Sequence, residues 1–396
     1  LGTGLVGGIM RNNGRMTATE EMIARGGGDL FLAADTNARH TNIEFPGHKH
    51  ITLYDVARIE PAVKKLLLDA GVVVHTHCRI KDITKDGSRI TGIIAEDFVT
   101  KEEIRASADV LVDASGTAGP QANCLKYGNG CAMCIYRCPT FGPRLSIAGK
   151  AGIPEMIGKK ADGSFGAMSG SCKLHKDSLS KDIVDKLDKT GVAIIALPDK
   201  LKKGAAALAQ KACQQYALPE FNDNIILLDT GHAKLMTSFY PLDKLRQVEG
   251  FENARFEDPY AGGIGNSMRY VGMLPRDNAL KVEGLDNVFC GGEKAGLLVG
   301  HTEAIVTGTL AGYNAARSAF GQPVITLPET LACGDAIAFV KASMATEEGM
   351  TKKYTFSGSV LFERMKQKGL YSTDRDAICE RVEKSKMTVV FSLKMQ

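Results

Sequence analysis

The segment that constrains the fold most is residues 285–317, LDNVFCGGEKAGLLVGHTEAIVTGTLAGYNAAR. A short apolar run at 287–290 meets Gly291-Gly292-Glu293, and a glycine-rich loop then leads into a predicted helix over 301–317. Small residues recur along that helix, so it can lie close to a sheet or a cofactor. We expect Thr302 to cap it, and its first amides to polarise an anionic group.

A second stretch has a similar form. The apolar run 110–114 is followed at once by Ser115-Gly116-Thr117. A buried strand that runs into small residues is typical of a sheet edge that meets a ligand, which makes Ala114, Ser115 and Gly116 candidate binding residues. An ordinary turn after a strand explains the sequence of residues 110–117 equally well.

The rest of the chain predicts an α/β fold with an inserted α+β domain. Helices are expected over 17–38, broken at Gly26-Gly27-Gly28, and over 53–71, where Gly71 ends the helix. Thr17 or Thr19 is the expected cap of the first. The period then changes to two, which predicts a meander of strands at 72–83, 89–98 and 102–117.

Beyond residue 150 the pattern alternates between helical and irregular segments, with the clearest helices at 176–191 and 204–217. The tail beyond Gly321 is expected to be helical, with a strand-like end at 386–393. The predicted division is therefore 1–145 for the first part of the core, 146–245 for the inserted substrate domain, 246–322 for the second part, and 323–396 for a helical extension.

Composition sets broad limits. The chain has 396 residues, of which 44% are hydrophobic, and a net charge of +4, which neither demands nor excludes a nucleic-acid partner. No stretch is long and apolar enough to cross a bilayer, so we expect a cytoplasmic protein without a membrane partner. Ten cysteines in such a chain suggest thiol, metal or redox chemistry.

The helix ending Ala311-Gly312-Tyr313-Asn314-Ala315-Ala316 resembles the C-terminal FAD motif of the GidA-type flavoproteins, AG-x-NAA. That group includes tRNA uridine-modifying enzymes and folate-dependent tRNA methyltransferases. Residues 246–287 and the strand VLVDASGT are similar to further segments of the family. The resemblance implies a Rossmann-like core of the two-dinucleotide-binding type with FAD as cofactor, Gly291, Gly292 and Glu293 near the ribitol, and Gly300, His301 and Thr302 facing the flavin pyrimidine.

The opening letters LGTGLVGG match G-x-G-x-x-G at Gly2, Gly4 and Gly7, yet only Leu1 precedes them, whereas a dinucleotide fingerprint follows a strand. The segment instead resembles the loop GG-x-x-T-x-G-L-V that follows the fingerprint in anaerobe-type FAD-dependent oxidoreductases. The resemblance covers about 1–145 and 245–320. It implies that Gly4 lies near FAD and that the βαβ start is missing here or supplied by another polypeptide.

A cysteine cluster lies at Cys131, Cys134 and Cys138, followed by Pro139. The spacing C-x2-C-x3-C-P is that of the last three cysteines in the bacterial ferredoxin motif, which predicts an iron-sulfur centre, for example [4Fe-4S]. A fourth ligand would come from Cys124, Cys172 or elsewhere. A redox dithiol, a zinc site and plain packing stay open. The resemblance implies that this loop lies near the isoalloxazine ring, which makes Cys134, Cys138 and Arg144 candidate catalytic residues.

Two histidines, His48 and His50, form a further candidate catalytic pair. At this spacing on an extended segment they face the same side, where they could orient an anionic substrate or act as acid and base. A surface strand is the plainer interpretation. Arg144 and Arg269 are candidates for holding a carboxylate or phosphate.

These features predict a flavin-dependent oxidoreductase that exchanges electrons with a small-molecule substrate or an electron-transfer partner, as a homo-oligomer or complex subunit. Two alternatives stay open. One is a tRNA uridine-modifying flavoprotein, although the scattered charge gives tRNA no support. The other is an electron-transfer subunit that completes its FAD site with a partner chain.

Overall fold

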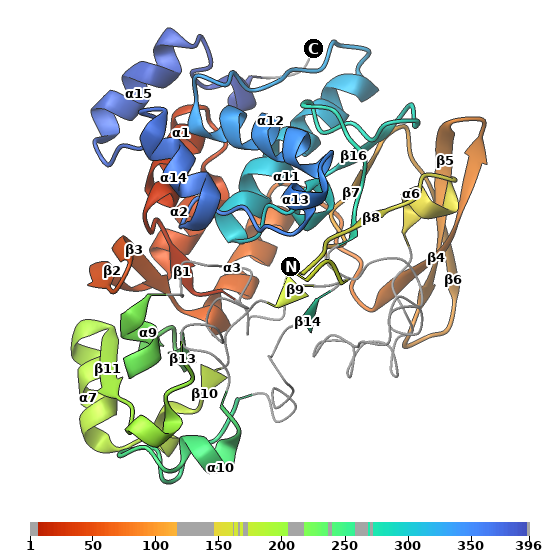
Figure 1. Cartoon of the computed structure of the whole chain (residues 1–396). Helices are drawn as coiled ribbons and strands as arrows, with labels where there is room; N and C mark the ends of the chain where they lie inside the picture. The colour runs from red at the N-terminus through yellow and green to blue at the C-terminus, as the bar shows by residue number, and fades with distance from the viewer. Residues whose placement is uncertain are drawn as a thin grey trace.

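The computed structural model describes residues 7–116, 146–160, 162–164, 167–168, 173–204, 218–236, 240–257, 268–269 and 272–393. At its centre lies a parallel pair of strands, β7 (Leu111–Asp113) and β16 (Val288–Cys290), in the register Leu111 to Val288 and Asp113 to Cys290. Helix α11 (His301–Ala319) packs on both strands (Figure 1). The predicted strand and helix on the two sides of the glycine loop are thus confirmed.

The meander at the edge of the molecule is an antiparallel sheet in the order β4 (Cys78–Asp86), β5 (Arg89–Asp97) and β6 (Glu103–Ser107). Asn287, which precedes β16, joins it to the core. Its side chain accepts from the backbone N–H of Ile90 (3.0 Å) and donates to the carbonyls of Ile90 (2.7 Å) and Asp109 (2.8 Å). The meander is shorter than predicted, since residues 72–77 form no strand and β7 leaves it to pair with β16.

A second three-stranded sheet has the order β1-β3-β2. Its strands are β1 (Ile9–Met10), β2 (Ala38–Phe45) and β3 (His48–Tyr54), and its neighbouring helices are α1 (Gly14–Ala24), α2 (Asp29–Thr36) and α3 (Val56–Asp69). The break at Gly26-Gly27-Gly28 separates α1 from α2, as predicted. Helix α1 starts earlier than expected, at Gly14, so Thr17 and Thr19 lie buried inside it and do not cap it.

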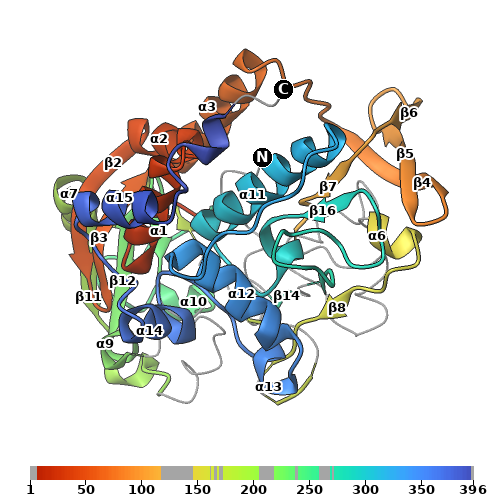
Figure 2. The same ribbon diagram turned by 90° about the horizontal axis from the view of Figure 1, so that it is seen from above.

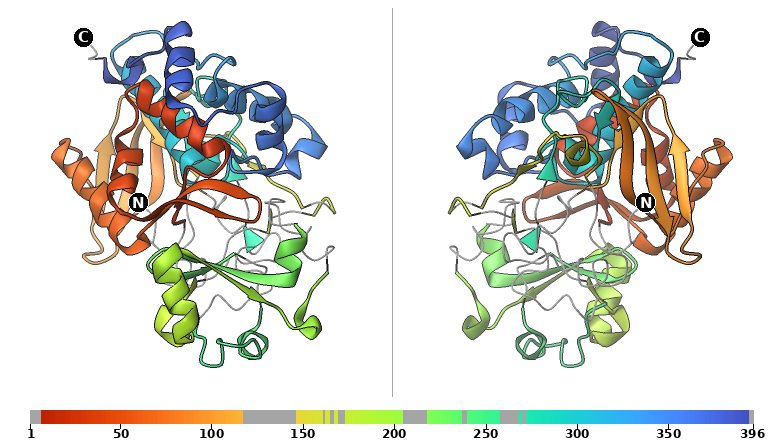
Figure 3. Two further views of the ribbon diagram at one scale, coloured as in Figure 1. Left: turned by 90° about the vertical axis from the view of Figure 1, so that its left-hand side faces the viewer. Right: turned by 90° about the vertical axis from the view of Figure 1, so that its right-hand side faces the viewer.

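The inserted domain has a four-stranded antiparallel sheet of its own in the order β10-β13-β12-β11. It comprises β10 (Lys173–Leu174), η1 (Lys176–Ser178), α7 (Lys181–Thr190), β11 (Val192–Ala196), η2 (Asp199–Leu201), α9 (Pro219–Asp223), β12 (Asn224–Asp229), β13 (Ala233–Leu235) and α10 (Leu242–Leu245). Buried residues between Leu174 and Ala254 form a separate core. Figures 1 and 3 show this domain in green below the rest of the molecule.

The tail is helical, with α12 (Ala332–Met344), α13 (Glu347–Met350), α14 (Ser359–Gln367) and α15 (Arg375–Lys384). Seen from above, α11 and α12 lie near the middle of the molecule (Figure 2). The predicted strand-like end is wrong: it forms the 3-10 turn η5 (Val390–Ser392). The backbone N–H groups of Val389 and Phe391 donate to the carbonyls of Ala24 and Arg25, so this end satisfies the last turn of α1 and not a sheet edge.

The remaining elements are short and lie between the core and the inserted domain in sequence. They are α6 (Ile147–Lys150), β8 (Met156–Ile157), β9 (Ala167–Met168), β14 (Met268–Arg269) and β15 (Gly272–Met273). Strand β15 pairs with β8, and β14 pairs with β9. Buried residues of α6 belong to the main core, together with those of α1, α11 and α12. Within the described residues no helix is long and apolar enough to cross a membrane.

Asn287→Ala should weaken the attachment of the meander. The change removes the side-chain partner of the buried N–H and carbonyl of Ile90, whereas the Asp109 carbonyl keeps Arg89 as donor (2.8 Å), so we expect the free energy of unfolding to fall by about 3 kcal/mol. Urea denaturation followed by circular dichroism measures this. Asn222→Ala, which removes an exposed amide that accepts from Gly204, is the matched control and should change stability by less than about 0.5 kcal/mol. Equal effects of the two variants would contradict the assigned role.

Candidate functional site

The carboxyl ends of β7 and β16 meet at one edge, where the backbone N–H of Gly291 donates to the carbonyl of Asp113 (3.1 Å). Asp113 Oδ1 accepts from the N–H (3.0 Å) and hydroxyl (2.7 Å) of Ser115. Its other oxygen, Oδ2, is buried and has no hydrogen-bond partner among the described residues. The edge thus brings Ala114, Ser115 and Gly116 beside Gly291 and Gly292, two segments about 175 residues apart, and offers a polar atom to a ligand.

Glycine is required at this edge by the closeness of α11. A Cβ on Gly291 would lie 3.0 Å from the Cα of Gly308, so the strand and the helix touch through backbone atoms. The N–H of Gly292 donates to Thr307 Oγ1 (2.8 Å), which holds the turn onto α11. Gly292 itself has φ +62° and open space around it, since a Cβ there would meet only the Cβ of Ala304, at 3.8 Å. Its backbone can therefore approach a ligand closely. Glu293 follows in the turn η4 (Gly292–Ala295) and is partly exposed.

The N-terminus of α11 is capped differently from the prediction. Gly300, at φ +144°, precedes the helix and has no side chain that could accept from its first amides. Thr302 lies inside the helix, is fully buried, and directs its hydroxyl toward the sulfur of Met10 (3.7 Å). The prediction of Thr302 as cap is wrong because the loop approaches at a φ that favours glycine, and a Cβ there would lie 2.0 Å from the Arg15 guanidinium.

A buried ion pair fixes this helix end. Arg15 of α1 donates through Nε to Glu303 Oε1 (3.1 Å), and its Nη2 lies 3.0 Å from Oε2. The same carboxylate accepts from the hydroxyl of Thr355 (2.7 Å) and the N–H of Phe356 (2.9 Å). Because Glu303 is fully buried, these partners are needed to stabilise its charge. Three distant segments are thereby joined at the first turn of α11.

The glycine turn at Gly7-Gly8 lies against this helix end. A Cβ on Gly7 would lie 2.0 Å from Cε1 of His301 and 2.6 Å from the Tyr54 hydroxyl. The rings of Tyr54 and His301 meet edge to face at 6.3 Å. Burial raises the pKa of Tyr54, so its phenol stays protonated at neutral pH. The start of the described chain therefore lies beside Gly300, His301 and Thr302, while Gly4 lies outside the described residues.

His48 and His50 do not form a symmetric pair. His50 has φ +60°, which breaks the alternation of β3, and it is half-buried, whereas His48 is 2% exposed. His48 Nδ1 lies 3.2 Å from the Asn12 amide nitrogen, and its ring packs on Phe45 at 4.5 Å. Burial, with a further contribution from Arg15, lowers the pKa of His48 to about 3. It is therefore neutral near pH 7, and the role of either histidine in catalysis stays a prediction.

The low pKa of His48 has a consequence for stability. Its ordinary pKa is about 6.5, so between pH 6.5 and about 3 the unfolded chain binds a proton that the folded chain does not. The contribution of neutral His48 to the free energy of unfolding is fully present above pH 6.5 and is lost as the pH falls. Between pH 6.5 and 4.5, the free energy of unfolding of the parent should fall with decreasing pH. In His48→Gln we expect this fall to be smaller by about 1.4 kcal/mol per pH unit, as measured by urea denaturation. His50→Gln is the control, and a slope unchanged in both variants would contradict the assignment.

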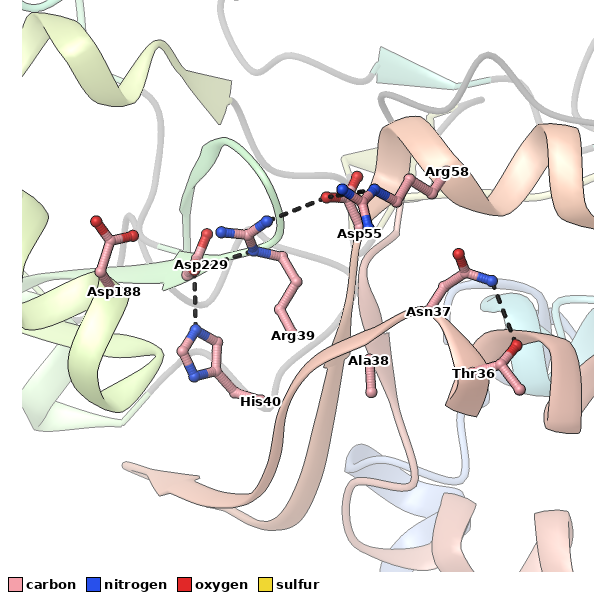
Figure 4. A pocket seen from close by; sticks show the side chains of 9 residues that line it. All are labelled: Thr36, Asn37, Ala38, Arg39, His40, Asp55, Arg58, Asp188 and Asp229. Atoms are coloured by element: carbon pink, nitrogen blue, oxygen red, sulfur yellow. Dashed lines mark hydrogen bonds and ion pairs between the residues drawn. The ribbon is translucent and has the colours of Figure 1, made fainter.

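A polar pocket of about 310 Å³ lies between the β2–β3 ribbon and the inserted domain, and Figure 4 shows its lining. Its centre is Asp229, a fully buried carboxylate at the end of β12. Oδ2 accepts from Arg39 Nε (3.0 Å) and lies 2.8 Å from His40 Nε2, and Oδ1 accepts from Lys176 Nζ (3.2 Å). Although burial acts to raise the pKa of Asp229, the hydrogen bond from His40 and the charges of Lys176 and Arg39 lower it. The network therefore ties the inserted domain to the core.

Asp229→Asn should loosen this attachment. Removal of the buried charge leaves Arg39 and Lys176 without their shared carboxylate, so we expect a loss of about 3 kcal/mol in the free energy of unfolding. Because the pKa of Asp229 is lowered in the folded chain, its contribution is present above pH 4 and is lost on acidification below it. Asp188→Asn is a matched control, since Asp188 also pairs with Lys176 but is half-exposed, and should cost less than about 1 kcal/mol. A loss in Asp229→Asn no larger than in the control would refute the network.

The cysteine cluster is not placed, because Cys131, Cys134, Cys138 and Arg144 lie outside the described residues, as do Cys124 and Cys172. The side chain of Arg269 is likewise not described. The described cysteines are not grouped: burial raises the pKa of Cys290 to about 12 and that of Cys333 well above its ordinary value, so both stay protonated thiols. Within the described part of the chain, no group of three or more His, Cys, Asp or Glu side chains could hold a metal ion.

Comparison with known proteins agrees with this geometry. The family model described as glucose inhibited division protein A matches residues 227–323, the segment that contains β16, the glycine turn and α11. The Aquifex aeolicus GidA structure in the form II crystal has a TM-score of 0.60 at 14% identity, covering 96% of this chain and 69% of that chain. The form I crystal gives a TM-score of 0.55 at 13% identity, with 96% and 72% covered.

The shared fold and the matched segment together confirm the resemblance that the helix ending 311–316 indicated. The parallel pair, the turn at Gly291-Gly292 and α11 are the elements of a Rossmann-like core. Over residues 227–323 the chain is thus similar to the GidA family, and its overall fold is similar to that of Aquifex aeolicus GidA.

Proposed function

We propose that this chain binds FAD at the carboxyl edge of β7 and β16 and exchanges electrons with a small-molecule substrate held against the inserted domain. The single observation that carries the proposal is the meeting of Asp113–Ser115 with Gly291-Gly292, which are held against Thr307 and Gly308 of α11. FAD supplies two-electron redox chemistry when bound. The residues present fit it, since this edge has a buried oxygen without a described partner and a glycine with open space.

Different residues of the chain would contact different parts of the cofactor. The backbone at Gly291-Gly292 would lie along the cofactor, with Glu293 near its ribitol. The positive end of the α11 dipole at Gly300, His301 and Thr302 would stabilise negative charge on the pyrimidine side. Arg15 neutralises Glu303 at the same helix end, so that this carboxylate does not cancel the dipole. Tyr54, protonated and buried beside His301, can donate a hydrogen bond without carrying charge.

Gly292→Asn tests the cofactor site without straining the backbone, because asparagine tolerates a φ of +62°. The added side chain would occupy the space assigned to FAD, so we expect at least a tenfold loss of FAD affinity, equivalent to about 1.4 kcal/mol. Titration of the purified chain with FAD, followed by flavin absorption and fluorescence, measures it. Gly321→Asn, at φ +68° with nothing within 4 Å, is the matched control. Unchanged FAD binding in Gly292→Asn would overturn the proposed site.

A finer proposal concerns Cys131, Cys134 and Cys138, which would pass electrons to or from the flavin through an iron-sulfur centre. Its support is the sequence spacing alone. Replacement of each cysteine by serine should lower the iron and acid-labile sulfide content of anaerobically purified protein to near zero while leaving bound FAD unchanged. Cys379→Ser, on the exposed face of α15, is the control. A parent protein that holds FAD but no iron would exclude the centre. The tRNA-modifying and partner-completed alternatives stay predictions.

A further inference from the structure

A continuous row of six charged side chains crosses the polar pocket between the β2–β3 ribbon and the inserted domain. In order along this charge row they are Asp188, Lys176, Asp229, Arg39, Asp55 and Arg58. The sign of the charge alternates from each residue to the next. All of them except Lys176 line the pocket (Figure 4). His40 also contacts Asp229 and leaves this order unchanged.

The four inner members of the charge row each have an opposite charge on both sides. Lys176 Nζ contacts Asp188 and lies 3.2 Å from Asp229 Oδ1. Arg39 Nε lies 3.0 Å from Asp229 Oδ2, and Arg39 Nη1 donates to Asp55 Oδ2 at 3.1 Å. Because these inner charges neutralise one another, they need no ligand.

The two ends of the charge row each have an opposite charge on one side only, within the part of the chain that the structure describes. Asp188 pairs with Lys176, and its side chain is 54% exposed. The Arg58 side chain is 77% exposed, and its Nε lies 3.9 Å from Asp55 Oδ2, which is beyond hydrogen-bond distance. Figure 4 shows Asp188 and Arg58 at opposite ends of the pocket lining. The pocket therefore has a carboxylate at one end and a guanidinium at the other.

Both end residues lie at the helix terminus that does not suit their charge. Asp188 is in the last turn of α7, where the helix dipole is negative, and Arg58 is in the first turn of α3, where the dipole is positive. The stability of the two helices would favour the reverse arrangement. Each dipole instead adds to the charge beside it, so one end of the pocket is negative and the other positive. Residues that break a local rule in this way are expected at functional sites.

The pocket has room for a ligand, and its two walls are held together. Its volume of about 310 Å³ corresponds to on the order of ten water-sized groups. At its centre Arg39 and His40 of β2 both contact the Asp229 carboxylate of the inserted domain. The helices that carry the two ends are thus joined across the domain boundary before a ligand enters, which lowers the cost of ordering the site on binding.

We propose that this pocket binds a small zwitterion whose ammonium and carboxylate groups lie at its two ends, such as an ω-amino acid. The ammonium pairs with Asp188 and the carboxylate accepts from the Arg58 guanidinium, so each end of the charge row gains a second opposite charge. Asp188 disfavours a simple anion and Arg58 a simple cation, which makes the pocket selective for a ligand that carries both charges. None of these residues belongs to the FAD edge, so the site is separate from the proposed cofactor site and does not depend on it.

Isothermal titration calorimetry of the purified full chain tests the site with β-alanine, γ-aminobutyrate and ε-aminocaproate, which differ in the separation of their two charges. Each is compared with the fatty acid and the alkylamine that have the same number of carbons. The titrations are run near neutral pH, where every carboxylate and amine is charged. We expect at least one zwitterion to bind at least tenfold more tightly than either of its singly charged analogues.

Asp188→Asn and Arg58→Gln assign the two ends of the ligand. Both side chains are exposed, so the variants should fold, and circular dichroism checks this. Each should weaken binding of the zwitterion at least tenfold. Asp188→Asn should also remove its advantage over the fatty acid, and Arg58→Gln its advantage over the alkylamine. Asp185→Asn on α7 and Arg105→Gln on β6, both exposed and outside the pocket lining, are the matched controls.

Three results would overturn the site. They are no binding of any of the three zwitterions, a zwitterion that binds no more tightly than one of its singly charged analogues, and binding that Asp188→Asn and Arg58→Gln leave unchanged. The FAD content of the same samples is read from their absorption. Zwitterion binding in a chain that takes up no FAD would count against the flavin proposal alone, and its absence in a chain that holds FAD against the zwitterion site alone.

Discussion

The structure depends on one close contact between backbones, that of β16 with α11 at Gly291 and Gly308. Because no side chain separates them, the strand, the helix and the turn between them form one rigid unit. β7 is then held in parallel register beside β16, and Asn287 ties the meander to the same strand. A larger residue at Gly291 would push α11 away from the sheet and open the edge at which Asp113 and Gly291 meet.

The N-terminus of α11 is where the rest of the molecule converges on this unit. Arg15 reaches it from α1, Thr355 and Phe356 from the tail, and Gly7 from the start of the described chain. The inserted domain reaches the same region through Lys234 and is anchored farther away by Asp229. A helix end that many segments contact has its first amides fixed in direction, which is a requirement for binding a cofactor whose charge changes during a reaction.

The parts of the fold that local patterns determine were predictable. A strand–glycine–helix segment has its own hydrophobic periodicity and a break at the glycines, so the elements within residues 285–317 can be predicted from the local sequence. The pairing of β7 with β16 depends on two segments far apart, and no pattern in the sequence predicted it. The cap at α11 was predicted at Thr302 because threonine is a good cap, but the approach of Arg15 and the loop φ select Gly300. Burial of His48 but not His50 follows from a positive φ that no local pattern indicates.

The Asp229 network and the burial of Lys173 and Lys234, which are partners across β10 and β13, were missed because both arise from contacts between domains. A signal for Asp229 did exist: NIILLDTG ends an apolar strand in an aspartate before small residues, as VLVDASGT does. For Lys173 and Lys234 the signal lies in the register, because alternation alone places them opposite Leu174 and Ala233 but does not say which face is covered. Charged residues that alternate with apolar ones along a strand predict a solvent-exposed face, and only the position of the partner sheet shows that this face is covered.

The central claim is that FAD lies at the edge formed by β7, β16 and the first turn of α11. Hydrogen–deuterium exchange of the purified chain, with and without saturating FAD, tests it most directly, because protection reports which backbone amides the cofactor covers or orders. The account predicts that FAD slows exchange in peptides covering 111–116 and 291–304 and leaves α15 unchanged. Protection confined to other segments, with these two exchanging at the same rate in both states, would contradict it.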